Sequence, residues 1–203
     1  MKVIDFPRIV FDVDNVLADT MTSFCRKASK LVGFKVDKQH IKNHKVVGSI
    51  PLPPQAIFSL QSVVWAEWEK LPTVEDNLLK KLHAIQKIGF EIYVATAAPL
   101  RLIPYVKQWL KKVQIPHNKF FHCHKGCSKS DIQAEALVDD APDEVQSFVR
   151  CGRQGFLYLQ PWNSTAKILG AILVRNIDDV LKHYGVRKEK DGTYRNTRWL
   201  GKA

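Results

Sequence analysis

Short apolar runs alternate with stretches of helical periodicity along most of this chain. The first run, Ile9-Val10-Phe11, suits a buried parallel strand. We predict strands at residues 9–12, 91–95, 120–123, 136–139 and 155–159, and a last one at 171–174. Between them the pattern predicts helices at residues 74–88, 100–113, 142–150 and 177–184. This alternation indicates an α/β fold with a doubly wound parallel sheet.

The stretch between the first two predicted strands is too long for a single crossover helix. A helix at residues 74–88 suffices for the crossover, so the preceding residues form an insertion. Helical spacing at residues 20–32 and 54–71 predicts that the insertion is a small helical cap over the edge where the strands end. The predicted division is a core of residues 1–17 and 73–185, a cap of residues 18–72 and a basic tail of residues 186–203.

The composition is that of a globular protein with an ample core. The chain has 203 residues, of which 45% are hydrophobic and 25% charged. No apolar run approaches the length needed to span a membrane, and no early segment has the form of a signal peptide. The cysteines are few and scattered, which favours reduced thiols over a disulfide framework. We therefore expect a cytoplasmic protein without a membrane partner.

The net charge of +11 favours anionic partners such as nucleotides, nucleic acid or an acidic surface. Lys and Arg outnumber Asp and Glu both in residues 21–72 and in residues 186–203. Binding of nucleic acid through the basic cap and tail is one interpretation. A solvated charged surface is the alternative, and for the tail the two are evenly balanced.

Two aspartates, Asp12 and Asp14, follow the first apolar run directly. Side chains alternate along an extended segment, so both carboxylates project into one cleft. One of such a pair can act as nucleophile or metal ligand and the other as general acid/base. An ordinary turn after a strand is the alternative for an isolated Asp-x-Asp. Asn15, which comes next, tolerates the left-handed backbone that a tight turn needs.

Three later strand ends also carry polar residues. Thr96 and Ala97 begin a turn whose hydroxyl and backbone N–H groups suit phosphate oxygens, although a plain helix cap explains them alone. Lys129 has the charge to neutralise a carboxylate and a phosphate. Asp139 and Asp140 end a strand in an acidic cluster that suits Mg²⁺. Ligands of open α/β sheets sit at this edge, so the sequence predicts one site.

Together these residues resemble the four motifs of the haloacid-dehalogenase-like superfamily of phosphotransferases. The matching residues occur in the family's order and span residues 8 to about 150; they are Asp12 and Asp14, Thr96, Lys129, and Asp139 with Asp140 and Asp143. Within that superfamily, the run from Asp12 to Asp19 is similar to the 5'(3')-deoxyribonucleotidases, as are the short helical cap and the segment Gln160-Pro161-Trp162-Asn163. Two departures from the family pattern are Asn15, where Gly is usual, and the alanines after Thr96.

The resemblance implies a Mg²⁺-dependent phosphatase, and most specifically a 5'-nucleotidase acting on (deoxy)nucleoside monophosphates. It assigns Asp12 as the nucleophile that forms an aspartyl-phosphate and Asp14 as the acid/base. Thr96, Ala97 and Lys129 would hold the phosphoryl oxygens. The metal would lie on the Asp12 carboxylate, the Asp14 backbone carbonyl, and Asp139 or Asp140.

Aromatic residues of the cap are candidates for stacking on a base. Phe24 and Trp65 are the predicted substrate-binding residues; the alternative is that the cap aromatics form a small core of their own. The segment from His122 to Cys127 resembles a zinc site only superficially, because its ligands are too crowded for a tetrahedral ion. We expect a strand end there, with His122 or His124 near the substrate.

Two other functions are compatible with the same residues. The positive charge also suits a polynucleotide-end phosphatase, and a non-catalytic nucleic-acid-binding protein on the same fold is the second alternative. The basic tail could fold back with Trp199 as an anchor, contact nucleic acid or stay disordered. The base, the sugar, the 5' or 3' position of the phosphate and the oligomeric state are left open.

Overall fold

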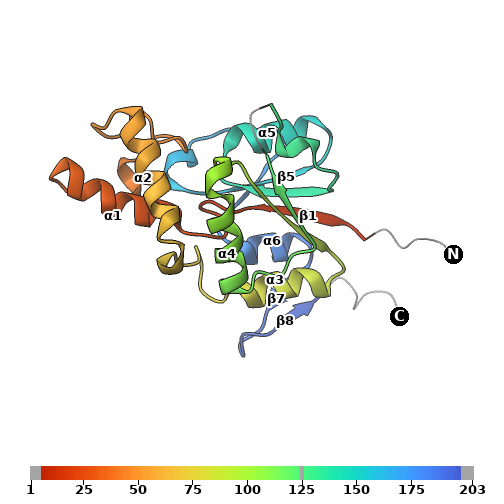
Figure 1. The fold of residues 1–203 in the computed structure, drawn as a ribbon. Coiled ribbons are helices and arrows are strands. Elements are labelled where there is room, and N and C mark those ends of the chain that lie inside the picture. Colours follow the sequence, from red (N-terminus) through yellow and green to blue (C-terminus); the bar gives the residue numbers. More distant parts are fainter. Residues whose placement is uncertain (1–5, 124–125, 198–203) are drawn as a thin grey trace, which may run out of the picture.

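The computed structural model describes residues 6–123 and 126–197 (Figure 1). Its main sheet has six parallel strands, in the order β3-β2-β1-β4-β5-β6. They are β1 (Arg8–Asp12), β2 (Glu91–Thr96), β3 (Lys119–His122), β4 (Ala136–Asp139), β5 (Gln154–Tyr158) and β6 (Ile172–Val174). The predicted parallel α/β sheet is confirmed. The strand order reverses beside β1, so the carboxyl ends of β1 and β4 flank the crevice in which such sheets bind ligands.

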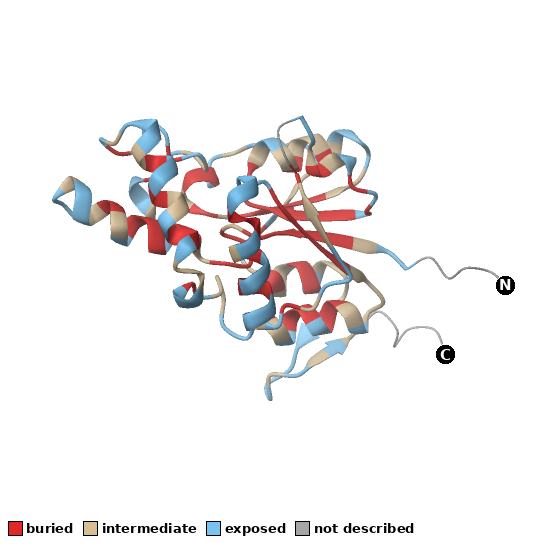
Figure 2. Cartoon of the chain, viewed as in Figure 1, coloured by how far each residue is buried: buried red, intermediate tan, exposed pale blue. Residues whose placement is uncertain are grey.

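Helices cover both faces of the sheet. One face packs against α3 (Leu78–Lys87), α4 (Ile103–Val113) and α6 (Ile177–His183), and the other against α5 (Pro142–Arg150). The four central strands, β1, β2, β4 and β5, are almost wholly buried between these layers (Figure 2). Helix α5 lies so close to β5 that a Cβ on Gly155 would meet Val149 Cγ2 at 2.6 Å. Any larger residue at position 155 would therefore push the two elements apart.

The insertion between β1 and β2 forms a helical layer beyond the carboxyl ends of the strands (Figure 1). We call residues 18–72 the cap. It contains α1 (Thr20–Val32) and α2 (Pro54–Ala66), which pack together, and short 3-10 helices at Lys38–His40 and Trp68–Lys70. The two segments that connect the cap to the core run antiparallel and are hydrogen-bonded to each other. Asp19 N donates to Pro72 O at 2.9 Å, and Val74 N donates to Leu17 O at 2.9 Å. The cap is thus joined to the sheet through a single narrow base.

Three predicted helices differ from the observed ones by three or more residues at an end. The helix predicted at 54–71 ends at Ala66 and is followed by a 3-10 turn, while the one predicted at 100–113 begins with a 3-10 turn at Leu100–Leu102. The helix predicted at 74–88 begins only at Leu78. Glu75 lies outside this helix, because the Glu75 carboxylate accepts hydrogen bonds from Tyr158 Oη and Ile177 N, each at 2.7 Å. Such long-range bonds override local helical periodicity.

Part of the predicted basic tail is ordered as an antiparallel hairpin. Strands β7 (Val186–Lys188) and β8 (Tyr194–Asn196) pair in it, while Trp199 lies outside the described residues. Within the described ranges no helix is both long and apolar enough to cross a bilayer.

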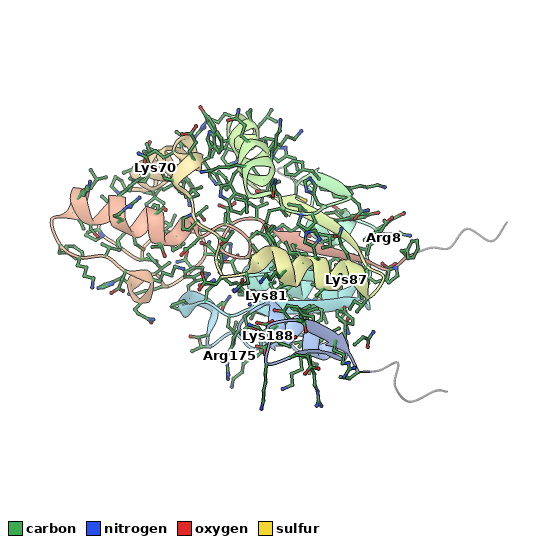
Figure 3. All side chains as sticks on the ribbon, turned by 90° about the horizontal axis from the view of Figure 1, so that it is seen from below. Arg8, Lys70, Lys81, Lys87, Arg175 and Lys188 are labelled. Atoms are coloured by element: carbon green, nitrogen blue, oxygen red, sulfur yellow. The ribbon has the colours of Figure 1, made fainter. Side chains whose placement is uncertain are left out.

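A partly buried ion pair joins the hairpin, α6 and α3. Lys81 on α3 lies on the side that faces the hairpin (Figure 3). Its Nζ is 2.7 Å from Asp178 Oδ2 and also bonds to Glu75. Tyr194 Oη donates to the other oxygen of Asp178 at 2.6 Å. Burial by itself raises the pKa of Asp178, but the hydrogen bonds from Lys81 and Tyr194 outweigh it and lower that pKa below its usual value.

Replacing Asp178 with Asn is expected to weaken the acid dependence of stability. A carboxyl group whose pKa is lowered by folding stabilises the fold above its unfolded pKa, and this contribution is lost as the pH falls through the folded value. Urea unfolding from neutral pH to about pH 2 should therefore show a smaller loss of stability for Asp178→Asn than for the wild type. Asp76→Asn, an exposed control two residues before α3, should follow the wild type; equal slopes for all three proteins would contradict the assignment.

Candidate active site

The strand ends and the cap enclose one cavity of about 520 Å³. Its floor comes from the ends of β1 and β4 and from the loop before β4, and its roof comes from α1 and α2. The register pairs Phe11 with Val138, so the residues that follow each of them, Asp12 and Asp139, lie side by side. The lining includes the predicted residues Asp12, Asp14, Phe24, Trp65, Ala97, Lys129, Asp139 and Asp140.

Lys129 lies at the centre of the floor. Its Nζ donates to Asp12 Oδ1 at 2.6 Å and to Asp139 Oδ2 at 2.5 Å, and its side chain is 3% exposed. Burial alone would lower the pKa of Lys129, but the adjacent charges of Asp12 and Asp139 hold that pKa well above its usual value. Lys129 is therefore a permanently charged group between two carboxylates.

The loop that carries Lys129 is held against α5. Residues Lys129–Asp131 form a 3-10 turn with a capping box at Ser128. The Glu144 carboxylate on α5 accepts from Lys129 N at 3.0 Å and from Ser128 Oγ at 2.9 Å. These bonds fix the backbone from which the long lysine side chain reaches the floor.

Three buried carboxylates gather beside Lys129. Oxygens of Asp12, Asp139 and Asp140 lie within 4.8 Å of one another, and no other group of His, Cys, Asp or Glu in the described ranges is arranged in this way. Burial, and then the neighbouring carboxylates, raise the pKa of Asp12 and of Asp140 well above the usual value, despite the charge of Lys129. Ionisation of all three carboxyl groups with one lysine as the only counter-charge is therefore disfavoured.

A loop after β5 holds Asp140 in this cluster. Trp162 Nε1 donates to Asp140 Oδ2 at 3.0 Å, and Asn163 Nδ2 donates to Asp140 O at 2.8 Å. Gln160 Nε2 reaches Asn15 O at 2.8 Å. The sequence pointed to residues 160–163 only through their resemblance to the deoxyribonucleotidases. Its structural role is to lock the ends of β1 and β4 together.

Asn15 makes the turn that follows the aspartate pair. Its φ is 63°, in the left-handed region that was expected of it. Its Oδ1 accepts from Met21 N at 2.9 Å and from Thr20 Oγ1 at 3.2 Å. Asn15 thereby fixes the start of α1, a role that a glycine at this position could not perform because it has no side chain.

The Asp14 carboxyl group accepts hydrogen bonds from residues of both the cap and the core. Trp65 Nε1 on α2 donates to Asp14 Oδ1 at 3.0 Å. Burial raises the pKa of Asp14, while hydrogen bonds from Thr20, Trp65 and Thr96 partly oppose that shift. Thr96 is fully buried, and its hydroxyl accepts from Ala98 N at 3.1 Å. Ala97 is exposed and lines the cavity.

The aromatic residues of the cap differ in exposure. Phe24 and Trp65 are each 3% exposed, whereas Phe58, which also lines the cavity, is 51% exposed. Sequence reasoning did not single out Gln61, which lines the cavity from α2. Nor did it single out His44, whose Nε2 lies 3.9 Å from Asp143 Oδ1 across the cavity mouth. Helical spacing on α2 gives the signal for Gln61, since it lies four residues before Trp65.

The segment after β3 lies near this edge. His122 Nε2 is 2.8 Å from Ala98 O, beside the turn that follows β2. Cys123 is buried, and burial raises the pKa of its thiol to about 11. The predicted substrate contact of His124 falls outside the described residues.

Comparison with known proteins shows that this chain is similar in structure to several solved proteins. A scan of the sequence against models of protein families gives no match, and a search of curated proteins gives none either. A haloacid dehalogenase-like hydrolase from Streptococcus pneumoniae superposes with a TM-score of 0.62 at 12% identity, over 88% of this chain and 98% of its own. A protein described as a predicted phosphoglycolate phosphatase from Haemophilus somnus gives 0.61 at 13% identity, over 88% and 97%.

A haloacid dehalogenase-like hydrolase from Bacillus subtilis, bound to magnesium, gives a TM-score of 0.58 at 11% identity, over 88% of this chain and 98% of its own. Identities this low report a shared fold and leave the substrate open. The chain therefore has the fold of the haloacid dehalogenase-like hydrolases, with a cluster of buried aspartates at the ends of β1 and β4.

Proposed function

We propose that this protein is a phosphatase that cleaves phosphomonoesters through an aspartyl-phosphate on Asp12, and that its substrates are (deoxy)nucleoside monophosphates. The observation that carries the proposal is the contact of Lys129 with both Asp12 and Asp139 at the floor of a cavity. Lys129 bonds to Asp12 Oδ1, and the second oxygen of the same carboxylate is the nucleophile. Lys129 also supplies positive charge where the phosphoryl oxygens gather charge.

Asp14 donates a proton in the first of two steps and accepts one in the second. In the first, an oxygen of Asp12 bonds to phosphorus while the bond to the leaving oxygen breaks, and Asp14 gives its proton to that oxygen. In the second, Asp14 takes a proton from water as the water oxygen attacks phosphorus, which frees Asp12 and inorganic phosphate. Burial raises the pKa of Asp14, which favours the protonated form needed in the first step.

The residues of the floor fit a divalent cation. Oxygens of Asp12, Asp139 and Asp140 lie within 4.8 Å of one another, and oxygen ligands are those that Mg²⁺ prefers. These three residues, with the backbone carbonyl of Asp14, would hold it. When bound, Mg²⁺ supplies the charge that lets an anionic nucleophile approach an anionic phosphate.

Addition of Mg²⁺ to metal-free protein is expected to raise its thermal stability. A ligand that binds only the folded state adds about 2.7 kcal/mol at about 100 times its dissociation constant. Asp140→Asn keeps an acceptor for Trp162 but removes one anionic ligand, so its melting temperature should rise much less. The exposed control Asp76→Asn should respond like the wild type. No shift in the wild type, or an equal shift in Asp140→Asn, would contradict the metal site.

The cavity supports a nucleotide as the substrate. Its wall above the floor is mainly apolar, with Phe24, Phe58 and Val64 among its residues, and such a wall suits the faces of a base. Gln61 also lines it, and its amide has no hydrogen-bond partner among the described residues. An amide offers both a donor and an acceptor, which the edge of a base can satisfy. The net charge of +11 favours attraction of the anionic ester.

A phosphate-release screen tests the proposal. Nucleoside and deoxynucleoside monophosphates with 5' or 3' phosphates should release phosphate in the presence of Mg²⁺ and much less after chelation. Oligonucleotides with terminal phosphates and phosphoglycolate form the comparison set. Faster turnover of oligonucleotides would favour the polynucleotide-end alternative, and faster turnover of phosphoglycolate would overturn the nucleotide assignment. Salt-sensitive binding of DNA without any turnover would support the non-catalytic alternative.

A further inference from the structure

Trp65 connects the cap directly to Asp14. It belongs to α2, yet its indole Nε1 donates to Asp14 Oδ1, 51 residues away in sequence, at 3.0 Å. An indole N–H is only a donor. The oxygen that it contacts therefore acts as the acceptor, and this bond fixes the orientation of the Asp14 carboxyl group.

The ring of Trp65 is held firmly in place. Only 3% of the residue is exposed, which leaves little of the ring for stacking on a base. It packs edge-to-face with the ring of Trp109 on α4, with ring centroids 6.4 Å apart and an interplanar angle of 87°. Trp109 is itself fully buried, and its Nε1 donates to Leu71 O at 2.9 Å. Rotation of Trp65 away from Asp14 would leave a cavity between α2 and α4, which is costly.

We infer that Trp65 is a positioning residue that holds the Asp14 carboxyl group in the orientation from which it acts on the substrate. The inference rests on the proposed phosphatase function, in which Asp14 acts as the acid. It differs from the substrate-binding role expected from the sequence, because the polar end of the ring contacts a residue of the chain. A group placed in the cap thus determines the geometry of an acid at the end of β1.

Substrates that differ in their leaving group separate this role from a merely structural one. The leaving group of a nucleoside 5'-monophosphate is the nucleoside, whose 5' oxygen would depart as an alkoxide and needs a proton. The leaving group of p-nitrophenyl phosphate is p-nitrophenolate, a stable anion that needs little help from an acid. The quantity to measure is kcat/KM, because it reports the steps up to formation of the phosphoenzyme. Trp65→Phe keeps a ring against Trp109 and removes the donor. Its kcat/KM should fall about tenfold more for the monophosphate than for p-nitrophenyl phosphate.

Trp68→Phe is the matched control, since Trp68 also lies in the cap and its indole donates no hydrogen bond within the described ranges. It should leave the ratio of the two kcat/KM values unchanged. Equal losses with both substrates in Trp65→Phe, or no loss, would overturn the inference while leaving the phosphatase intact. Absence of turnover by the wild type would overturn the proposed function and this inference with it.

A second measurement does not need turnover. The indole N–H of Trp65 is assigned in a nitrogen-15 NMR spectrum as the signal missing from Trp65→Phe. We expect it to be protected from hydrogen exchange in the wild type, and to lose about tenfold or more of that protection in Asp14→Ala, which retains the rest of the floor. An exchange rate that is unaffected by Asp14→Ala would overturn the contact on which the inference is built.

Discussion

Replacement of Asp12 with Asn is expected to lower phosphate release by about 10⁴-fold or more. The amide is a poor nucleophile, while its size and shape leave the floor intact. Because burial raises the pKa of Asp12, the native carboxylate is held in an unfavourable environment. Lys129 retains Asp139 as a partner at 2.5 Å. We therefore expect the melting temperature of Asp12→Asn to equal or exceed that of the wild type.

Mass spectrometry of acid-quenched reactions adds a direct observation. The wild type should carry one additional phosphoryl group during turnover, and Asp12→Asn should carry none. Asp76→Asn makes the same chemical change at an exposed position and should retain full turnover. Unchanged phosphate release by folded Asp12→Asn would exclude Asp12 as the nucleophile.

Replacement of Lys129 with Met is expected to lower the free energy of unfolding by about 3–5 kcal/mol in metal-free buffer, because removal of one partner leaves buried carboxylates uncompensated. Lys129 has 3% of its side chain exposed and contacts two aspartates. Urea unfolding with a chelator present measures the loss. Lys111→Met, at an exposed position of α4, should change stability little. Turnover should also be lost, since the phosphoryl group loses its nearest fixed cation.

The pH dependence of Lys129→Met distinguishes lost charge from lost packing. A carboxyl group whose pKa is raised by folding binds more protons in the folded state, so stability rises as the pH falls toward its unfolded value. The pKa values of Asp12 and Asp140 are raised already with Lys129 in place. Stability lost by the variant at pH 7 should therefore be partly regained near pH 5. A loss that is independent of pH would indicate a packing defect.

Local patterns were sufficient to predict the sheet and most helices. Helices α1 and α5 match their predicted ranges at both ends, because apolar spacing and terminal residues mark them locally. Helix α3 was predicted four residues too early, since Glu75 is recruited by β5 and α6. The hairpin of β7 and β8 was missed, because its polar residues gain order from contacts such as that of Tyr194 with Asp178.

The floor of the site was more predictable than its roof. Parallel strands bring their carboxyl ends to one edge, so strand order gathers Asp12 and Asp139 there, and Lys129 reaches both from the loop before β4. The contact of Trp65 with Asp14 depends on how the cap packs over that edge. Helical periodicity places Trp65 on the buried side of α2, but it cannot specify which group the indole nitrogen meets. That information lies only in the three-dimensional packing.

The narrow base of the cap has a consequence for how new specificities arise. The chain leaves and re-enters the core through adjacent residues, joined by the hydrogen bonds of Asp19 to Pro72 and of Val74 to Leu17. Closing a loop across so short a gap costs only about 0.6 kcal/mol for each doubling of its length. We therefore expect caps of other lengths to be exchangeable here without disturbing the residues of the floor. One restriction follows from the role inferred for Trp65: a replacement cap that lacks a donor to Asp14 would change proton transfer together with substrate choice.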